Sequence, residues 1–157
     1  MTHMSDMTDS NPLWGLPDPD RQAEFYADVP AKRLVAWLLD TLLISIITAV
    51  IVPFTAFTAL FFLPLLFLVV GFVYRVVSLA NRSATPGMRL AAIEFRTHRG
   101  ERFDGGMALL HTIGYSLSMA MVFPQVISII LMLTSARKQG LSDLVLGSAV
   151  VNKNARF

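Results

Sequence analysis

The feature that most constrains this chain is residues 41–74, which contain no Asp, Glu, Lys or Arg. A helix that crosses a bilayer needs about 20 mostly apolar residues, so this stretch is long for one helix and short for two. Pro53 and Pro64 lie near its middle and favour a turn there. We therefore predict a transmembrane hairpin with helices over 32–52 and 59–79. Only 15% of the chain is charged, against about 25% for soluble domains, which agrees with an integral membrane protein.

A second uncharged stretch covers residues 105–136 and contains Pro124. It fits either one long tilted helix or a helix pair broken at Pro124. Basic residues gather before the first helix, in 75–104 and in 137–157, whereas the 53–63 turn has none. Because Lys and Arg are enriched in cytoplasmic loops, the chain should cross an even number of times after the middle loop, or re-enter. We therefore favour the break, and leave open whether this region crosses once, twice or re-enters.

Two short segments have the pattern of strands. Residues 90–97 alternate polar and apolar side chains, and 148–152 are rich in β-favouring residues. We expect a small cytoplasmic sheet that joins 90–97 with 148–152, or a β-hairpin that turns at 98–100 and returns over 101–103. The fold class predicted is an all-α membrane protein with an N-terminal transmembrane helical hairpin, a third hydrophobic region broken near Pro124, and this small β element.

Asp40 is an ionisable residue inside the predicted first helix, where such a group needs a partner or a cavity. Arg33 lies on the same helix face, but about 10.5 Å away along the axis. If the hairpin is centred near residue 57.5, two residues at the same depth in its two helices have numbers that add to 115. Arg75 should therefore lie opposite Asp40. We therefore predict an intramembrane ion pair between Asp40 and Arg75 that fixes the register of the helices. The alternative is that Asp40 is a cation or proton relay site.

Other chemistry finds little support in the sequence. No nucleophile–base pair or phosphate-binding glycine loop is apparent, so we do not expect an enzyme. The histidines His3, His98 and His111 lack metal-site spacing, so no metal or cofactor is expected. The Arg-rich loop could bind anionic lipid headgroups. It lacks the interleaved aromatic residues of a nucleic-acid site, so nucleic acid is not expected as a partner.

Three motifs together resemble the RDD family of small bacterial membrane proteins, which is named for one arginine and two aspartates. They are residues 31–40 with Arg33 and Asp40, the loop Thr85-Pro86-Gly87, and residues 140–151 with Asp143 and Gly147. The resemblance covers residues 28–152 and implies that Arg33, Asp40 and Asp143 are the signature residues. We expect Asp143 to cap the Gly147 turn or to pair with an arginine of the middle loop.

The charge distribution and the resemblance together predict a location and a range of functions. We expect a multi-pass protein of the bacterial inner membrane with both termini in the cytoplasm. An RDD-like domain over 29–152 would follow a flexible polar tail, 1–28, and precede a short tail, 153–157. The function expected is that of a membrane interaction or assembly component, with a second copy or another membrane protein as partner. Some family members are linked to cation/proton exchange, so a Na⁺/H⁺ or other cation transporter subunit using Asp40 is an alternative, and anionic-lipid binding by the loop is another.

Overall fold

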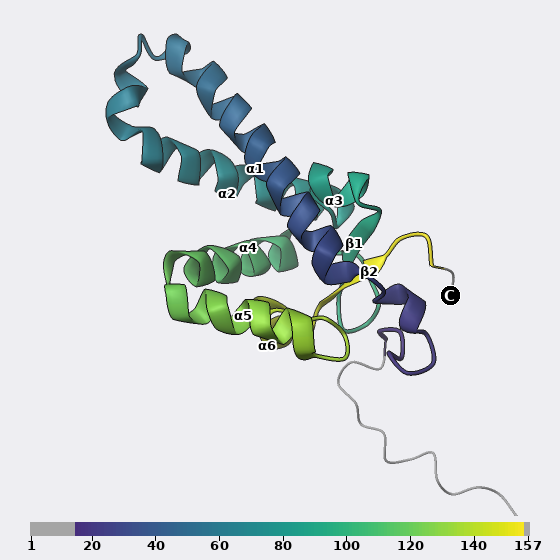
Figure 1. Ribbon diagram of the computed structural model, residues 1–157. Helices are drawn as coiled ribbons and strands as arrows, with labels where there is room; N and C mark the ends of the chain where they lie inside the picture. The colour runs from purple at the N-terminus through teal and green to yellow at the C-terminus, as the bar shows by residue number, and fades with distance from the viewer. Residues whose placement is uncertain (1–14, 156–157) are drawn as a thin grey trace, which may run out of the picture.

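The structure, a computed structural model, describes residues 15–155 and is mostly helical. Helix α1 (Val29–Phe54) and helix α2 (Leu63–Arg82) form the predicted hairpin, joined through a short 3₁₀ turn, Thr58–Phe62 (Figure 1). Both are long and apolar enough to cross a membrane. Pro64 lies in the first turn of α2, where its missing N–H removes no helical hydrogen bond. The helical hairpin is confirmed: α1 is two or three residues longer at each end than predicted, whereas α2 begins four residues later and ends three residues later.

The third apolar region is broken into helix α4 (Gly105–Ala120) and helix α5 (Val122–Thr134). The chain bends by 116° from the first helix to the second. The break falls at Met121, three residues before Pro124. Proline lies in the first turn of α5 because the first N–H groups of a helix have no partner within it. In Figure 1 both helices lie below the hairpin. The bent pair has the form of a broken span or of a re-entrant loop.

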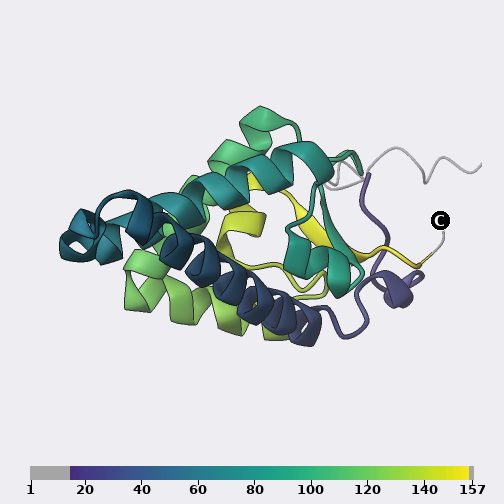
Figure 2. The same ribbon diagram turned by 90° about the horizontal axis from the view of Figure 1, so that it is seen from above.

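A two-stranded antiparallel sheet lies at one end of the hairpin. Strand β1 (Ile93–Arg96) pairs with strand β2 (Ala149–Asn152), with Ile93 opposite Asn152. The predicted strands and the predicted pairing between them are therefore confirmed, and they form a sheet rather than a β-hairpin. Two short helices, α3 (Pro86–Leu90) and α6 (Leu141–Leu146), precede β1 and β2 respectively. In Figure 2 the sheet lies between the ends of α1 and α2, beside α3. We call this end of the molecule the sheet end.

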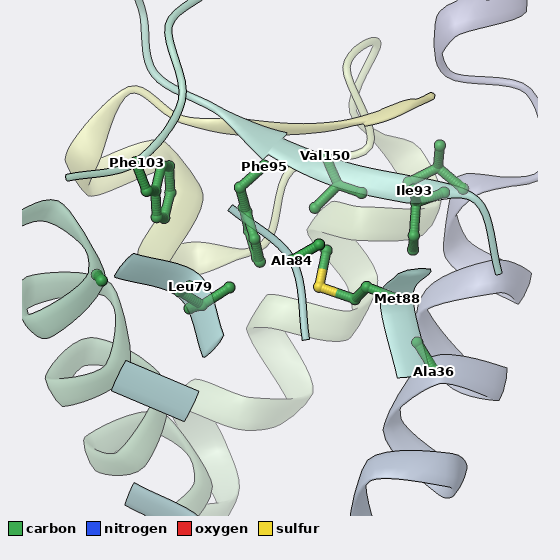
Figure 3. Close-up of a cluster of buried hydrophobic side chains, with 10 residues drawn as sticks. Ala36, Leu79, Ala84, Met88, Ile93, Phe95, Phe103 and Val150 are labelled. Atoms are coloured by element: carbon green, nitrogen blue, oxygen red, sulfur yellow. The ribbon is translucent and has the colours of Figure 1, made fainter. Parts of the chain in front are cut away.

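The main core joins the sheet to the helix ends. Phe95 and Ile93 of β1 point toward Met88 of α3, and Leu79 of α2 and Ala36 of α1 complete the cluster (Figure 3). All five side chains are buried. The sheet thus packs across α1, α2 and α3 and holds the loop between α2 and β1 in place.

Residues 15–28 pack against the other face of the sheet. Phe25 and Tyr26 are buried with Val151 of β2, and the Tyr26 hydroxyl donates to the carbonyl of Pro17 at 2.8 Å. This half of the segment expected to be a flexible tail is therefore folded, because its two aromatic rings supply apolar surface that the sheet covers. Residues 1–14 of that segment lie outside the described residues.

Candidate functional site

Asp40 is buried in α1 and accepts three hydrogen bonds. Its Oδ1 atom accepts from the Tyr74 hydroxyl of α2 at 2.6 Å and from the Gly87 backbone N–H at 2.8 Å. Its Oδ2 atom accepts from the Thr85 hydroxyl. The carboxylate therefore ties α1 both to α2 and to the loop that enters α3.

The Thr85-Pro86-Gly87 motif is shaped for this contact. The Thr85 side chain also caps α3 by accepting from the Met88 N–H, and Pro86 occupies the first turn, where no N–H is needed. A Cβ atom on Gly87 would lie 2.3 Å from the Ala36 carbonyl oxygen and 2.8 Å from Asp40 Oδ1. Only glycine lets this loop approach α1 so closely.

The predicted ion pair between Asp40 and Arg75 is wrong. Among residues 15–155 no ion pair joins these two side chains, and it is the Tyr74 hydroxyl that reaches Asp40. Successive residues of a helix point about 100° apart, so Arg75 points away from Asp40 when Tyr74 points toward it. Arg75 faces α4 instead, where its guanidinium carbon lies 3.8 Å from the centre of the Tyr115 ring.

The other two signature residues form an ion pair with each other. Arg33 Nη1 lies 2.6 Å from Asp143 Oδ2, with side chains 18% and 1% exposed. His111 of α4 contacts Asp143 Oδ1 through Nε2 at 2.8 Å, and the Gly140 N–H donates to Oδ2 at 3.0 Å. Asp143 therefore joins α1, α4 and the start of α6.

One of the two roles expected of Asp143 is present. Asp143 closes the turn at Gly147, since its carbonyl accepts from the Gly147 and Ser148 N–H groups and its Oδ1 accepts from the Ser148 hydroxyl at 3.4 Å, and Gly147 has the left-handed conformation, with φ of 70°. The cation is Arg33 of the first helix rather than an arginine of the middle loop. His111 was missed as a partner, although a lone histidine in an uncharged stretch is a signal that a polar contact is needed.

The electrostatic surroundings keep Asp143 ionised. Burial alone raises the pKa of this carboxyl group, but the Arg33 guanidinium and the His111 hydrogen bond outweigh burial and hold the pKa below its usual range. Because an ionised carboxylate only accepts hydrogen bonds, His111 donates through Nε2. Its other ring nitrogen, Nδ1, has no partner within the described part of the chain.

Beside these two clusters lies a groove of about 960 Å³. One wall is formed by α1 and the other by α4 and α5, and the three signature residues are among the lining residues. Trp37 of α1 bridges the walls by donating to the Tyr115 hydroxyl at 2.9 Å. The remaining exposed lining is mainly apolar. Its polar side chains are Ser118, Gln125 and Ser128 of α4 and α5, together with Asp28, Arg75, Lys138 and Ser142. We call this space the lateral groove.

Two apolar helices of spanning length, with ionisable side chains buried where they meet the sheet end, define an α-helical membrane protein. The chain belongs to the RDD family, whose model matches residues 28–147. That match includes Arg33, Asp40 and Asp143. No curated protein and no solved structure matches the chain.

Proposed function

We propose that this chain is a membrane interaction or assembly protein that binds an apolar helix of another membrane protein in its lateral groove. One observation carries the proposal: both signature aspartates are occupied by partners within the chain, while the space beside them is not filled by its own side chains. The charges would hold the fold, and the groove would bind the partner.

The hydrogen bonding of Asp40 favours this interpretation over ion relay. Both carboxylate oxygens are engaged, and their donors come from a loop that glycine holds tightly against α1. A relay site would have to release these donors in each cycle and leave buried groups unpaired, which costs about 1–3 kcal/mol for each group. The same occupancy of Asp40 and Asp143 supports a role without catalysis.

The size and lining of the groove suit a helix. A helix about 10 Å wide that rises 1.5 Å per residue occupies about 120 Å³ per residue, so a groove of about 960 Å³ takes roughly two turns. Ser118 donates to the Gln125 side-chain oxygen at 3.1 Å, and the Gln125 amide N–H groups have no partner among residues 15–155. Because polar side chains join helices within membranes, the partner helix should present small and hydrogen-bonding residues here.

The proposal includes a location. We place the chain in the bacterial inner membrane as a multi-pass protein with both termini in the cytoplasm. Support comes from the basic residues, which gather at the sheet end and are missing from residues 53–63.

The absence of cysteine from the sequence allows a clean test. Ile129→Cys places a thiol in the groove, and Ile130→Cys places one on α5 outside the groove lining, at similar exposures of 46% and 52%. Each variant is labelled in intact membranes with a short photoreactive maleimide and irradiated. We expect a discrete protein adduct from position 129 and none from position 130. Equal adducts from both positions, or lipid adducts alone at position 129, would count against the groove as a helix site.

A further inference from the structure

A second, smaller pocket of about 60 Å³ lies at the sheet end, where α2 finishes. Four cationic side chains line it, together with one carboxylate and two buried apolar residues. The cations are Arg82, Arg89, Arg102 and Lys153, the carboxylate is Glu94, and the apolar residues are Ala84 and Ile93. We call it the basic pocket. It shares no lining residue with the lateral groove.

The four cations come from four separate segments. Arg82 is the last residue of α2, Arg89 lies in the last turn of α3, and Arg102 precedes α4. Lys153 follows β2 and is held there because its backbone N–H donates to the Ala92 carbonyl at 2.8 Å. The fold therefore brings together charges that lie up to 71 positions apart in the sequence, from 82 to 153.

The charge of the basic pocket is not balanced within the chain. Glu94 is buried and is already bound by the Arg96 guanidinium. Over the described range, 15–155, none of the four lining cations forms an ion pair. Converging like charges create a positive potential that attracts an anion, and arginine guanidinium groups match the oxygens of phosphate particularly well.

The position of the pocket indicates the source of that phosphate. Arg82 ends the apolar span Thr58–Arg82, and basic residues at the end of a membrane helix reach the lipid headgroups. Val77 on α2 and Leu90 beside Arg89 are exposed apolar residues close to this end. A phosphate in the pocket would therefore have apolar protein surface next to it, as a phospholipid requires.

We infer that the basic pocket binds the phosphate of an anionic phospholipid whose acyl chains lie along α2. Basic pockets at the ends of membrane helices are a recurrent form of lipid headgroup site. This site is independent of the lateral groove, so partner binding can fail while lipid binding persists.

The test compares two double variants of the full chain with equal charge changes. Arg82→Gln with Arg102→Gln removes two pocket cations, while Arg21→Gln with Arg99→Gln removes two exposed arginines outside the pocket. Purified protein in mild detergent is mixed with phosphatidylglycerol or phosphatidylcholine, and retained lipid is measured by native mass spectrometry. Wild type and the control should prefer phosphatidylglycerol, whereas the pocket variant should bind it about thirtyfold more weakly.

Further arms separate the possible outcomes. A melting curve for each variant shows whether it is folded, and the single variant Lys153→Gln serves if the pocket double variant is not. Inorganic phosphate is added as a competitor to distinguish a soluble phosphate from a lipid. Phosphatidylglycerol binding that persists in millimolar phosphate supports the inference. No preference between the two lipids, equal loss in both double variants, or full displacement by phosphate would overturn it.

Discussion

Replacing Asp143 with asparagine should destabilise the protein strongly without changing the shape of the side chain. The introduced amide would turn an N–H₂ group toward donors that now face a carboxylate, namely Arg33, the Gly140 N–H and His111. Removing one partner from a buried ion pair costs about 3–5 kcal/mol. Arg33 keeps 18% exposure and its guanidinium lies 5.5 Å from the centre of the Phe95 ring, so we expect about 3 kcal/mol, at the lower end of that range.

The assay is thermal unfolding of the purified chain in detergent. For a protein of this length, 1 kcal/mol shifts the melting temperature by about 2–4 °C, so Asp143→Asn should lower it by about 6–12 °C. Glu101→Gln makes the same chemical change at an exposed position and should stay within about 0.5 kcal/mol of wild type.

A double-mutant cycle with Arg33→Gln tests the cause of that loss. Once either partner of the pair is removed, removal of the second should cost little more, since the uncompensated charge is then gone. A shift below about 2 °C for Asp143→Asn, or a double variant whose loss equals the sum of the single losses, would refute the reasoning.

Three further predictions concern the two aspartates and the loop. Asp40→Asn leaves too few acceptors for its three donors and should lower the free energy of unfolding by about 2 kcal/mol. In everted vesicles we expect wild type to cause no cation-dependent collapse of a proton gradient. A collapse that occurs in wild type and is abolished by Asp40→Asn would make Asp40 a transport site. Gly87→Ala places a Cβ atom 2.3 Å from the Ala36 carbonyl oxygen and should lower the melting temperature markedly. In the control, Gly105→Ala, the new Cβ atom meets nothing within 4 Å, so the melting temperature should not change. The folded pKa of Asp143 lies below its unfolded value, so its stabilising contribution is complete at neutral pH and is lost as pH falls below about 4 toward the folded pKa; the melting temperature of wild type should therefore fall more steeply in acid than that of Asp143→Asn.

The elements that rest on local sequence patterns could be predicted. The uncharged residues 41–74 and their two prolines located the hairpin, and alternation located β1. Pro124 indicated the break in the third region, but it marked the first turn of the second helix rather than the bend itself. The reason is that a proline is tolerated wherever its N–H is unneeded, which leaves several possible positions for the bend.

The contacts between distant segments could not be predicted as reliably. The depth argument for Asp40 did not give the direction of the side chains, and it is Tyr74 that reaches the site while Arg75 turns toward α4. The pairing of Arg33 with Asp143 spans 110 positions and depends on how α6 packs against α1 and α4. Hydrophobic periodicity within either segment contains no information on that packing.

The two signature clusters together suggest how the lateral groove stays open. Arg33 and Asp40 lie seven residues apart on one face of α1, and that face is bound at both levels, by Asp143 and by the loop before α3. The first wall, α1, is held in this way, and the second wall contains the 116° bend between α4 and α5. The groove between these two walls therefore cannot be closed by a small shift of α1.

Loss of the Arg33–Asp143 pair should therefore affect the groove as well as stability. We expect the adduct formed from Ile129→Cys to be lost in the Asp143→Asn background, at a temperature where melting curves show that the variant is still folded. The same variant should keep its phosphatidylglycerol preference, because the basic pocket does not include Asp143. An adduct retained at full strength would mean that α4 and α5 shape the groove without the clamp on α1.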